Sequence, residues 1–221
     1  MEYAEALDLQ RRIVSAISAR VIEADILLVL EHRPVFTLGS RGGLENLLVS
    51  DDFLRKRGIR VIGAERGGNI TFHGPGQIVA YPVINLPESG FSVAEFVSGL
   101  EEVMIRAAAE RGIKAERGLK HRGVWVGNRK LGSVGIRIRR GISFHGLALN
   151  VNIDLEPFKW INPCGLEHIE MTSFKRELYR PISMPGMRKT VMNFFADLFK
   201  KDLLKTELPK LQEMIKCPSA A

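Results

Sequence analysis

The chain has 221 residues, which suits one domain with a substantial core, and its 45% hydrophobic and 26% charged residues are ordinary for a globular protein. No apolar run approaches the length of a membrane span, and the N-terminus lacks the basic-then-apolar pattern of a secretion signal, so we expect a cytoplasmic protein without a membrane partner. The net charge of +7 favours an acidic partner, although a solvated basic surface with no special partner stays open. Nucleic acid is disfavoured, because zinc-finger spacing and aromatic residues interleaved with basic ones are both missing.

Residues 1–221 are expected to form a single domain with a disordered tail from about residue 216 to 221. The two cysteines, Cys164 and Cys217, suit a reducing compartment and predict no disulfide. Cys217 lies in the tail and is given no role.

The first third of the chain mixes helical and strand-like patterns. Apolar residues at helical spacing predict a helix within residues 2–20. The next expected elements are a buried strand at 25–31, an extended piece at 35–41, a short helix at about 51–57 and a strand at 59–64.

A glycine-rich segment follows at residues 66–77, and its glycines let the backbone pass close to a ligand. A phosphate-binding loop is disfavoured there, because no Gly-Lys-Ser/Thr follows. The next expected strand, at 78–86, contains Pro82. Since proline cannot donate to a strand ladder, we expect a sheet edge or a bulge at this point.

Two helices are expected around the middle and the end of the chain. Ser92 and Glu95 form a capping box, which predicts a helix running to about Arg111. A final amphipathic helix is expected from about residue 187 to 204.

A meander of three strands is expected between these helices. It follows an exposed basic loop at 117–122, and its strands are expected at 124–126, 130–139 and 142–153. Alternation along the second strand puts Lys130 on one face with four apolar or small residues, which are Gly132, Val134, Ile136 and Ile138. A lysine there is costly to bury unless it has a partner or gives up its proton.

Past the meander, residues 162–165 have the composition of a turn, which puts Cys164 at the end of a loop. Cysteine reacts as its thiolate, and a nearby amine favours that form, so Lys130 and Cys164 are a candidate nucleophilic pair. Spacing alone does not bring them together. A buried cysteine and a solvated lysine are the more common outcome for such residues.

Three motifs carry a resemblance to a known family. The run at 141–150 reads GISFHGLALN, residues 161–165 read INPCG, and residues 66–77 read RGGNITFHGPGQ. Together with Lys130 just before Leu-Gly-Ser-Val-Gly, they resemble the octanoyltransferase family of lipoate biosynthesis over roughly residues 30–175. The resemblance implies an α/β (α+β) sandwich with a mixed or antiparallel sheet and flanking helices, the catalytic fold shared by biotin and lipoate protein ligases.

The resemblance also implies a reaction that needs neither a cofactor nor a metal. An octanoyl group would move from octanoyl-acyl carrier protein to a lysine on the lipoyl domains of 2-oxoacid dehydrogenase complexes and on the H protein of glycine cleavage. Cys164 would attack the thioester and hold the acyl group, while Lys130 would activate it and later take a proton from the incoming amine. Backbone N–H groups near 146–148 or 133–135 are alternatives for holding the oxyanion.

Three segments match the acyl-binding segments of the family. Their residues are Arg66, Gly67, Gly68, Asn69, Ile70, Thr71, Phe72, His73, Ser133, Val134, Gly135, Gly146, Leu147 and Ala148. Arg137, Arg139, Arg140 and the loop at 117–122 are candidate docking sites for acidic protein substrates.

Other functions stay open at this point. An ATP-dependent lipoate or biotin ligase would use the same scaffold without a cysteine in this loop. A hydrolase would pair Cys164 with His73 or His145 and release free acid. A non-catalytic protein that binds acyl carrier protein or nucleic acid is a further alternative. Cys164 and His168 alone are too few ligands for a metal site.

Overall fold

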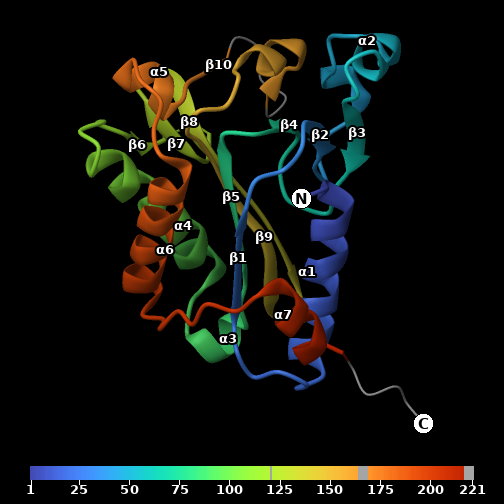
Figure 1. Ribbon diagram of the computed structural model, residues 1–221, viewed down its shortest axis with the longest axis vertical. Coiled ribbons are helices and arrows are strands. Elements are labelled where there is room, and N and C mark those ends of the chain that lie inside the picture. Colours follow the sequence, from blue (N-terminus) through green and yellow to red (C-terminus); the bar gives the residue numbers. More distant parts are fainter. Residues whose placement is uncertain (120, 164–168, 217–221) are drawn as a thin grey trace.

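The computed structural model describes residues 1–119, 121–163 and 169–216. Its larger sheet has seven strands, six of them in the order β1-β5-β9-β8-β7-β6, and β10 pairs with β8 in parallel (Figure 1). The strands are β1 (Ile26–Leu30), β5 (Gln77–Val83), β6 (Glu116–Arg117), β7 (Val124–Val126), β8 (Arg129–Arg139), β9 (Ile142–Asn150) and β10 (Glu170–Met171). Apart from β10, neighbouring strands of this sheet run antiparallel, and the expected meander forms β7, β8 and β9.

A second sheet has the order β3-β2-β4, with β2 (Val35–Leu38) parallel to β3 (Arg60–Gly63) and antiparallel to β4 (Ile70–His73). The short helices η1 (Leu44–Asn46), α2 (Asp51–Arg55) and η2 (Glu156–Trp160) lie around it. β4 is part of the glycine-rich segment. The phenylalanines Phe36, Phe72 and Phe158 pack together in the core of this part.

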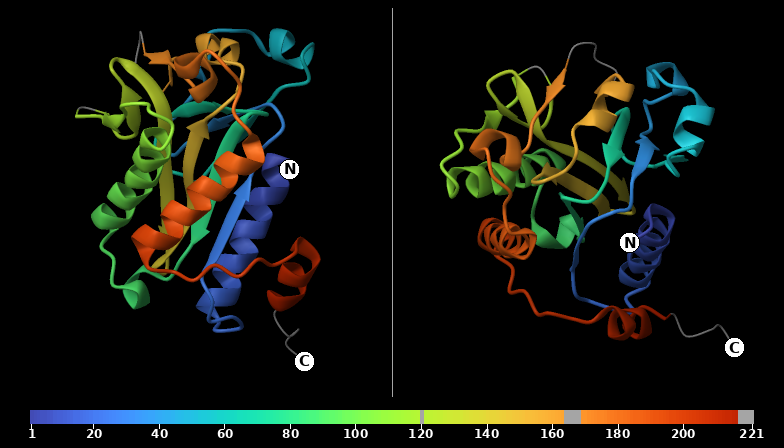
Figure 2. Two further views of the ribbon diagram at one scale, coloured as in Figure 1. Left: turned by 60° about the vertical axis from the view of Figure 1, so that its left-hand side comes forward. Right: turned by 45° about the horizontal axis from the view of Figure 1, so that its top comes forward.

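Helices cover both faces of the larger sheet, so the expected fold class, an α/β sandwich with a mixed, mostly antiparallel sheet, is confirmed (Figure 2). α4 (Val93–Ala109) and α6 (Met184–Phe199) share one apolar core with β5, β8 and β9. α1 (Tyr3–Ser18) packs on the opposite face, and α7 (Leu208–Met214) lies beside it and buries Leu211. Two short helices, α3 (Leu86–Ser89) and α5 (Phe174–Leu178), complete the described elements.

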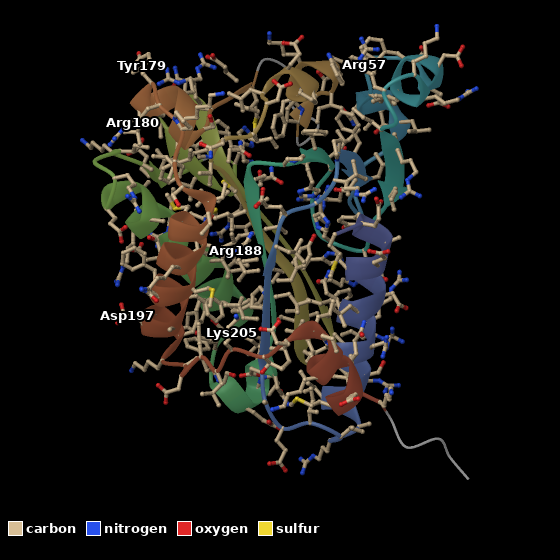
Figure 3. All side chains as sticks on the ribbon, in the orientation of Figure 1. Arg57, Tyr179, Arg180, Arg188, Asp197 and Lys205 are labelled. Carbon is tan, nitrogen blue, oxygen red and sulfur yellow. The ribbon has the colours of Figure 1, made fainter. Side chains whose placement is uncertain are left out.

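Ion pairs connect α6 to its neighbours. Asp197 accepts from Arg106 of α4 at 2.8 Å, and Arg188 donates to Glu31 at 3.2 Å. Figure 3 labels Asp197 and Arg188 along this helix, and shows Arg180 projecting outward beyond α5.

The helix boundaries follow their capping signals. The capping box of Ser92 and Glu95 is formed at the start of α4, as expected. α6 ends at Phe199 instead of about residue 204, because Lys200 takes a left-handed conformation with φ +51°. α7 was not predicted, since so short a helix has too few buried positions to show a period.

The strand that contains Pro82 is not at the edge of the sheet. β5 lies between β1 and β9, and its pairing with β9 ends at Ala80, two residues before the proline. Beyond that point the Ser143 hydroxyl bridges the strands by donating to the Pro82 carbonyl at 2.8 Å and accepting from the Ile84 N–H at 3.2 Å. The edge expectation is wrong. Proline is tolerated because the ladder to β9 has already opened there.

The alternation expected along β8 is also wrong at its start. β7 shifts register against β8, so that Leu131 is an extra residue between Lys130 and Gly132. An extra residue reverses the alternation of side chains. Leu131 joins the core beside α4, Gly132 faces Met104 of α4, and Lys130 does not share their face.

No helix in the described ranges is long and apolar enough to cross a bilayer. The expected disordered tail lies, except for Lys216, outside the described residues.

Candidate active site

A cavity of about 890 Å³ lies between the two sheets and reaches the start of α4. It brings together the three segments expected to bind the acyl group, together with Lys130. Its lining residues are Arg41, Arg66, Gly67, Gly68, Asn69, Ile70, Thr71, His73, Val79, Tyr81, Val93, Ala94, Val97, His121, Arg122, Lys130, Ser133, Val134, Gly135, Ile136, His145, Gly146, Leu147 and Ala148. Phe72 is the exception among the expected binding residues, because its ring packs against Phe36 and Phe158 in the core.

The glycine-rich segment crosses from the smaller sheet to the edge of β8. Arg66 is buried and donates from Nη2 to the carbonyl and hydroxyl oxygens of Thr37 in β2, at 2.7 Å each. The Gly67 N–H donates to the Ile136 carbonyl of β8 at 2.9 Å. A Cβ on Gly135 would lie 2.9 Å from the Gly67 carbonyl oxygen, so a glycine at this position permits the close approach of the two backbones.

Lys130 is 2% exposed and its backbone is held on both sides. It pairs with Trp125 of β7 and with Met171 of β10, and its carbonyl accepts from the Thr172 N–H at 2.9 Å. Nζ donates to the Arg122 carbonyl at 3.0 Å and lies 5.3 Å from the centre of the Trp125 ring, a cation–π distance. The amine is therefore fixed at the cavity wall.

Cys164 and His168 lie outside the described residues, but the chain on either side of them is attached to the cavity walls. On one side, the Asn162 N–H donates to the Asn46 carbonyl at 2.8 Å, and the Asn46 amide donates to the side chain of the cavity residue Asn69 at 3.3 Å. On the other side, Met171 pairs with Lys130.

Comparisons with known proteins agree with this arrangement. The family model described as the lipoyl protein ligase A/B catalytic domain matches residues 2–196. An octanoyltransferase of Desulfotalea psychrophila is 46% identical over 86% of this chain and 86% of its own length. An octanoyltransferase of Syntrophobacter fumaroxidans is 41% identical over 97% of this chain and 94% of its own.

The chain belongs to the octanoyltransferase family. It is therefore an acyltransferase. Among solved structures, a lipoate protein ligase of Thermoplasma acidophilum, described as putative, superposes with a TM-score of 0.72 over 94% of this chain and 87% of that one. At 16% identity this likeness concerns the fold alone, and it confirms the expected ligase-like fold.

Two histidines of the cavity are buried and neutral. His73 donates from Nδ1 to Gln77 Oε1 at 2.7 Å, and burial, together with the nearby His32 and Arg66, lowers its pKa well below the ordinary value. Burial and the charge of Arg66 lower the pKa of His145 to about 3. Within the described part of the chain, neither ring nitrogen of His145 has a hydrogen-bond partner.

Several cavity residues were not expected from the sequence as binding residues. His145 adjoins the Gly146–Ala148 segment, and its backbone is left-handed at φ +57°, which a strand pattern does not reveal. Val93, Ala94 and Val97 belong to the first turns of α4, and only the tertiary fold brings that end of the helix to β8. In the sequence, Val93 and Val97 share the apolar face of a helix that the capping box begins, and that pattern predicts a core position and not a cavity wall.

A line of buried amides connects His73 to Thr172, whose N–H donates to the Lys130 carbonyl. Gln77 donates to Asn150 Oδ1 at 2.9 Å, and Asn150 donates to the Thr172 carbonyl at 3.0 Å. Buried polar groups that are fully hydrogen-bonded make a core rigid. In the described ranges, no group of three or more His, Cys, Asp or Glu side chains is placed to hold a metal ion.

Proposed function

We propose that the chain transfers an octanoyl group from octanoyl-acyl carrier protein to a lysine of a lipoyl domain, through a thioester on Cys164. Membership of the octanoyltransferase family supports octanoyl transfer in protein lipoylation. The observation that carries the proposed chemistry is the placement of Lys130 in the wall of the same cavity as all the expected binding residues except Phe72.

The reaction has two acyl transfers. The Cys164 thiolate attacks the carbonyl carbon of the carrier thioester, and the carbon–sulfur bond to the carrier breaks. Lys130, which holds the proton taken from Cys164, gives that proton to the departing carrier thiolate, so the carrier leaves as a thiol and the amine of Lys130 is left neutral. The acceptor amine then attacks the new thioester, Lys130 takes the proton that the amine loses, and Cys164 leaves as the thiolate. Each step exchanges one acyl bond for another, so no nucleotide is needed.

The cavity offers an apolar wall for the chain of the acyl group. Ile70, Val79, Val134 and Leu147 line it from three strands of the larger sheet and one of the smaller. Each methylene buried there contributes about 0.8 kcal/mol. The depth of the cavity therefore selects the length of the acyl chain, and the preference between chains that differ by one carbon is modest.

The histidine environments argue against the hydrolase alternative. A general base works best when its pKa lies near the working pH, and burial lowers the pKa of His73 and His145 far below that. These imidazoles are poor proton acceptors. The ATP-dependent ligase alternative needs a nucleotide and the transferase does not, so an activity assay without ATP distinguishes the two.

The deciding experiment records the intact mass of the protein after mixing with octanoyl-acyl carrier protein in the absence of ATP. We expect an octanoyl adduct that Cys164→Ala abolishes and that Cys217→Ala, the matched control for the other cysteine, retains. Apo lipoyl domain and apo H protein should then each gain the octanoyl mass. An unmodified Cys164, or activity that survives Cys164→Ala, contradicts the thioester mechanism, and free octanoate without acylated acceptor indicates a hydrolase.

A further inference from the structure

A buried carboxylate of α4 lies behind Lys130. Glu101 is 1% exposed, although glutamate is almost never fully buried unless it is paired. Its arginine neighbours are Arg117 at 3.8 Å and Arg122 at 3.3 Å, and their side chains are 45% and 62% exposed. Cations so exposed offset little of the cost of burying a carboxylate. The short contact of Glu101 is with the Gly123 N–H, which donates to Oε1 at 2.8 Å.

The peptide group between Arg122 and Gly123 connects this carboxylate to Lys130. Its N–H donates to Glu101, and its carbonyl accepts from Nζ of Lys130 at 3.0 Å. Hydrogen bonds in series polarise one another inside a protein, and a bond to an ionised group is stronger than a neutral one. The series from carboxylate to peptide to amine therefore holds Nζ in one position.

Gly123 packs the same peptide against the lysine side chain. Its φ is +120°, and a Cβ there would lie 2.8 Å from Cε of Lys130 and 2.5 Å from the Gly132 carbonyl oxygen. Only glycine has no Cβ to clash at these distances and also adopts this φ without strain. The orientation of the peptide is thus set by Glu101 on one side and by the packed lysine on the other.

We propose that Glu101 is a positioning residue, which fixes the amine of Lys130 at the cavity through the peptide group of Arg122 and Gly123. The proposal rests on the proposed function, in which Lys130 exchanges protons with Cys164 and with the acceptor amine. Glu101 does not line the cavity, so it acts on the reaction through a residue that does. Lys130 is held through the shared peptide and Arg122 through its ion pair at 3.3 Å, and the double variant with Lys130→Arg distinguishes the two routes.

The first test is Glu101→Gln, which keeps the shape of the side chain and removes its charge. The matched control is Glu102→Gln, because Glu102 is the next residue of α4 and pairs with Arg106 and Arg117 but not with the Gly123 peptide. We expect kcat for transfer from the carrier to fall about tenfold in E101Q, with KM changed less than about twofold. Both kcat and KM of E102Q should stay within about twofold of the parent values. Parent kcat in E101Q, or an equal loss in E102Q, overturns the proposal.

A double variant separates positioning from a general weakening of the fold. Residues that act through one another have non-additive effects, so Glu101→Gln should change the residual rate of Lys130→Arg by less than about twofold. A further tenfold loss in the double variant overturns the proposal.

Chemical labelling gives a readout that does not depend on the proposed mechanism. Trace acetylation with acetic anhydride, followed by peptide mass spectrometry, measures the reactivity of Lys130. We expect its labelling rate to change at least about threefold in E101Q and to stay unchanged in E102Q, because the Arg122 carbonyl that accepts from the amine is less polarised and less firmly held without the Glu101 charge. If Cys164→Ala or Lys130→Arg keeps full activity, the proposed function fails, and the labelling rate still decides the role of Glu101. An unchanged rate overturns the positioning under either mechanism.

Discussion

Lys130 is constrained at both ends, by strand pairing at its backbone and by the Arg122 carbonyl at its amine. Arginine is larger, planar and always protonated, so it can neither occupy this position without displacement nor accept a proton. We expect Lys130→Arg to lower kcat for octanoyl transfer by a factor of about 10² to 10⁴, the usual contribution of a general base. The measurement is transfer to apo lipoyl domain followed by intact mass, and activity within about twofold of the parent would remove Lys130 from the mechanism.

Three buried histidines make the fold sensitive to acid. Burial lowers the pKa of His32 to about 4 and that of His145 to about 3, and His73 is lowered as well. In the unfolded chain all three titrate near the ordinary value of about 6.5, so below that pH the unfolded state binds more protons. The free energy of unfolding is therefore highest above pH 6.5 and falls as the pH approaches 4 and then 3.

This sensitivity can be measured by urea unfolding at a series of pH values. Each histidine contributes a slope of up to about 1.4 kcal/mol per pH unit between its two pKa values. His145→Gln should remove its share of the slope between about pH 6 and pH 4, because glutamine does not titrate. The control Asn128→Gln changes an exposed amide that does not titrate, so it should leave the slope unchanged. Equal slopes in the two variants would show that burial of His145 does not oppose its protonation.

At the scale of elements, the start of α4 depends on its cap. The Glu95 N–H donates to the Ser92 hydroxyl at 3.2 Å, and the Ser92 N–H donates to the Glu95 carboxylate at 2.9 Å. Ser92→Ala removes one half of this box and should lower the free energy of unfolding by about 1 kcal/mol. Ser98→Ala, within the same helix, should cost nothing, because alanine is the better helix former. Chemical denaturation of both variants measures the difference, and an equal effect of the two substitutions would contradict a role for the cap.

The elements that were predictable are those whose signals are local. The capping box located α4, and the alternating pattern around Gly141 located β8 and β9. Two positions failed because pairing partners decide them. Pro82 is tolerated inside the sheet because Ser143, far along the chain, bridges the gap beside it, and Leu131 turns Lys130 to another face because β7 shifts its register.

The site was predictable only as far as motifs extend. The expected binding segments were found by resemblance, and the fold brings them to one cavity. Glu101 left no signal, because a glutamate on a helix is usually solvated and its contact with Gly123 forms only after the helix packs. Contacts between residues far apart in the chain cannot be inferred from periodicity.

For the whole molecule, the net charge is +7, and a strip of three arginines follows the cavity residues of β8 along the chain. Gly135 and Ile136 line the cavity, and the exposed Arg137, Arg139 and Arg140 follow directly. An acidic carrier protein should be attracted to this strip, and salt weakens such attraction. Raising the ionic strength from about 50 to about 300 mM should lower kcat/KM for octanoyl-acyl carrier protein about tenfold. The same change in ionic strength should leave kcat/KM for the uncharged donor octanoyl-N-acetylcysteamine unchanged.

The matched variant is the triple substitution of Arg137, Arg139 and Arg140 by alanine. It should raise KM for the carrier donor and flatten its salt dependence, while kcat with the uncharged donor stays at the parent value. Unchanged salt dependence in this variant would show that the carrier docks elsewhere.

The register of β8 gives these arginines a second consequence. β7 pairs with β8 only as far as Gly132. From there on, the edge of β8 that faces away from β9 carries no paired strand, and the Gly67 N–H donates to it at the Ile136 carbonyl. An open strand edge invites another chain to add a strand, and charged residues along it discourage such association. Removing the arginines would leave a surface prone to self-association, so light scattering should accompany the kinetic assays of the triple variant.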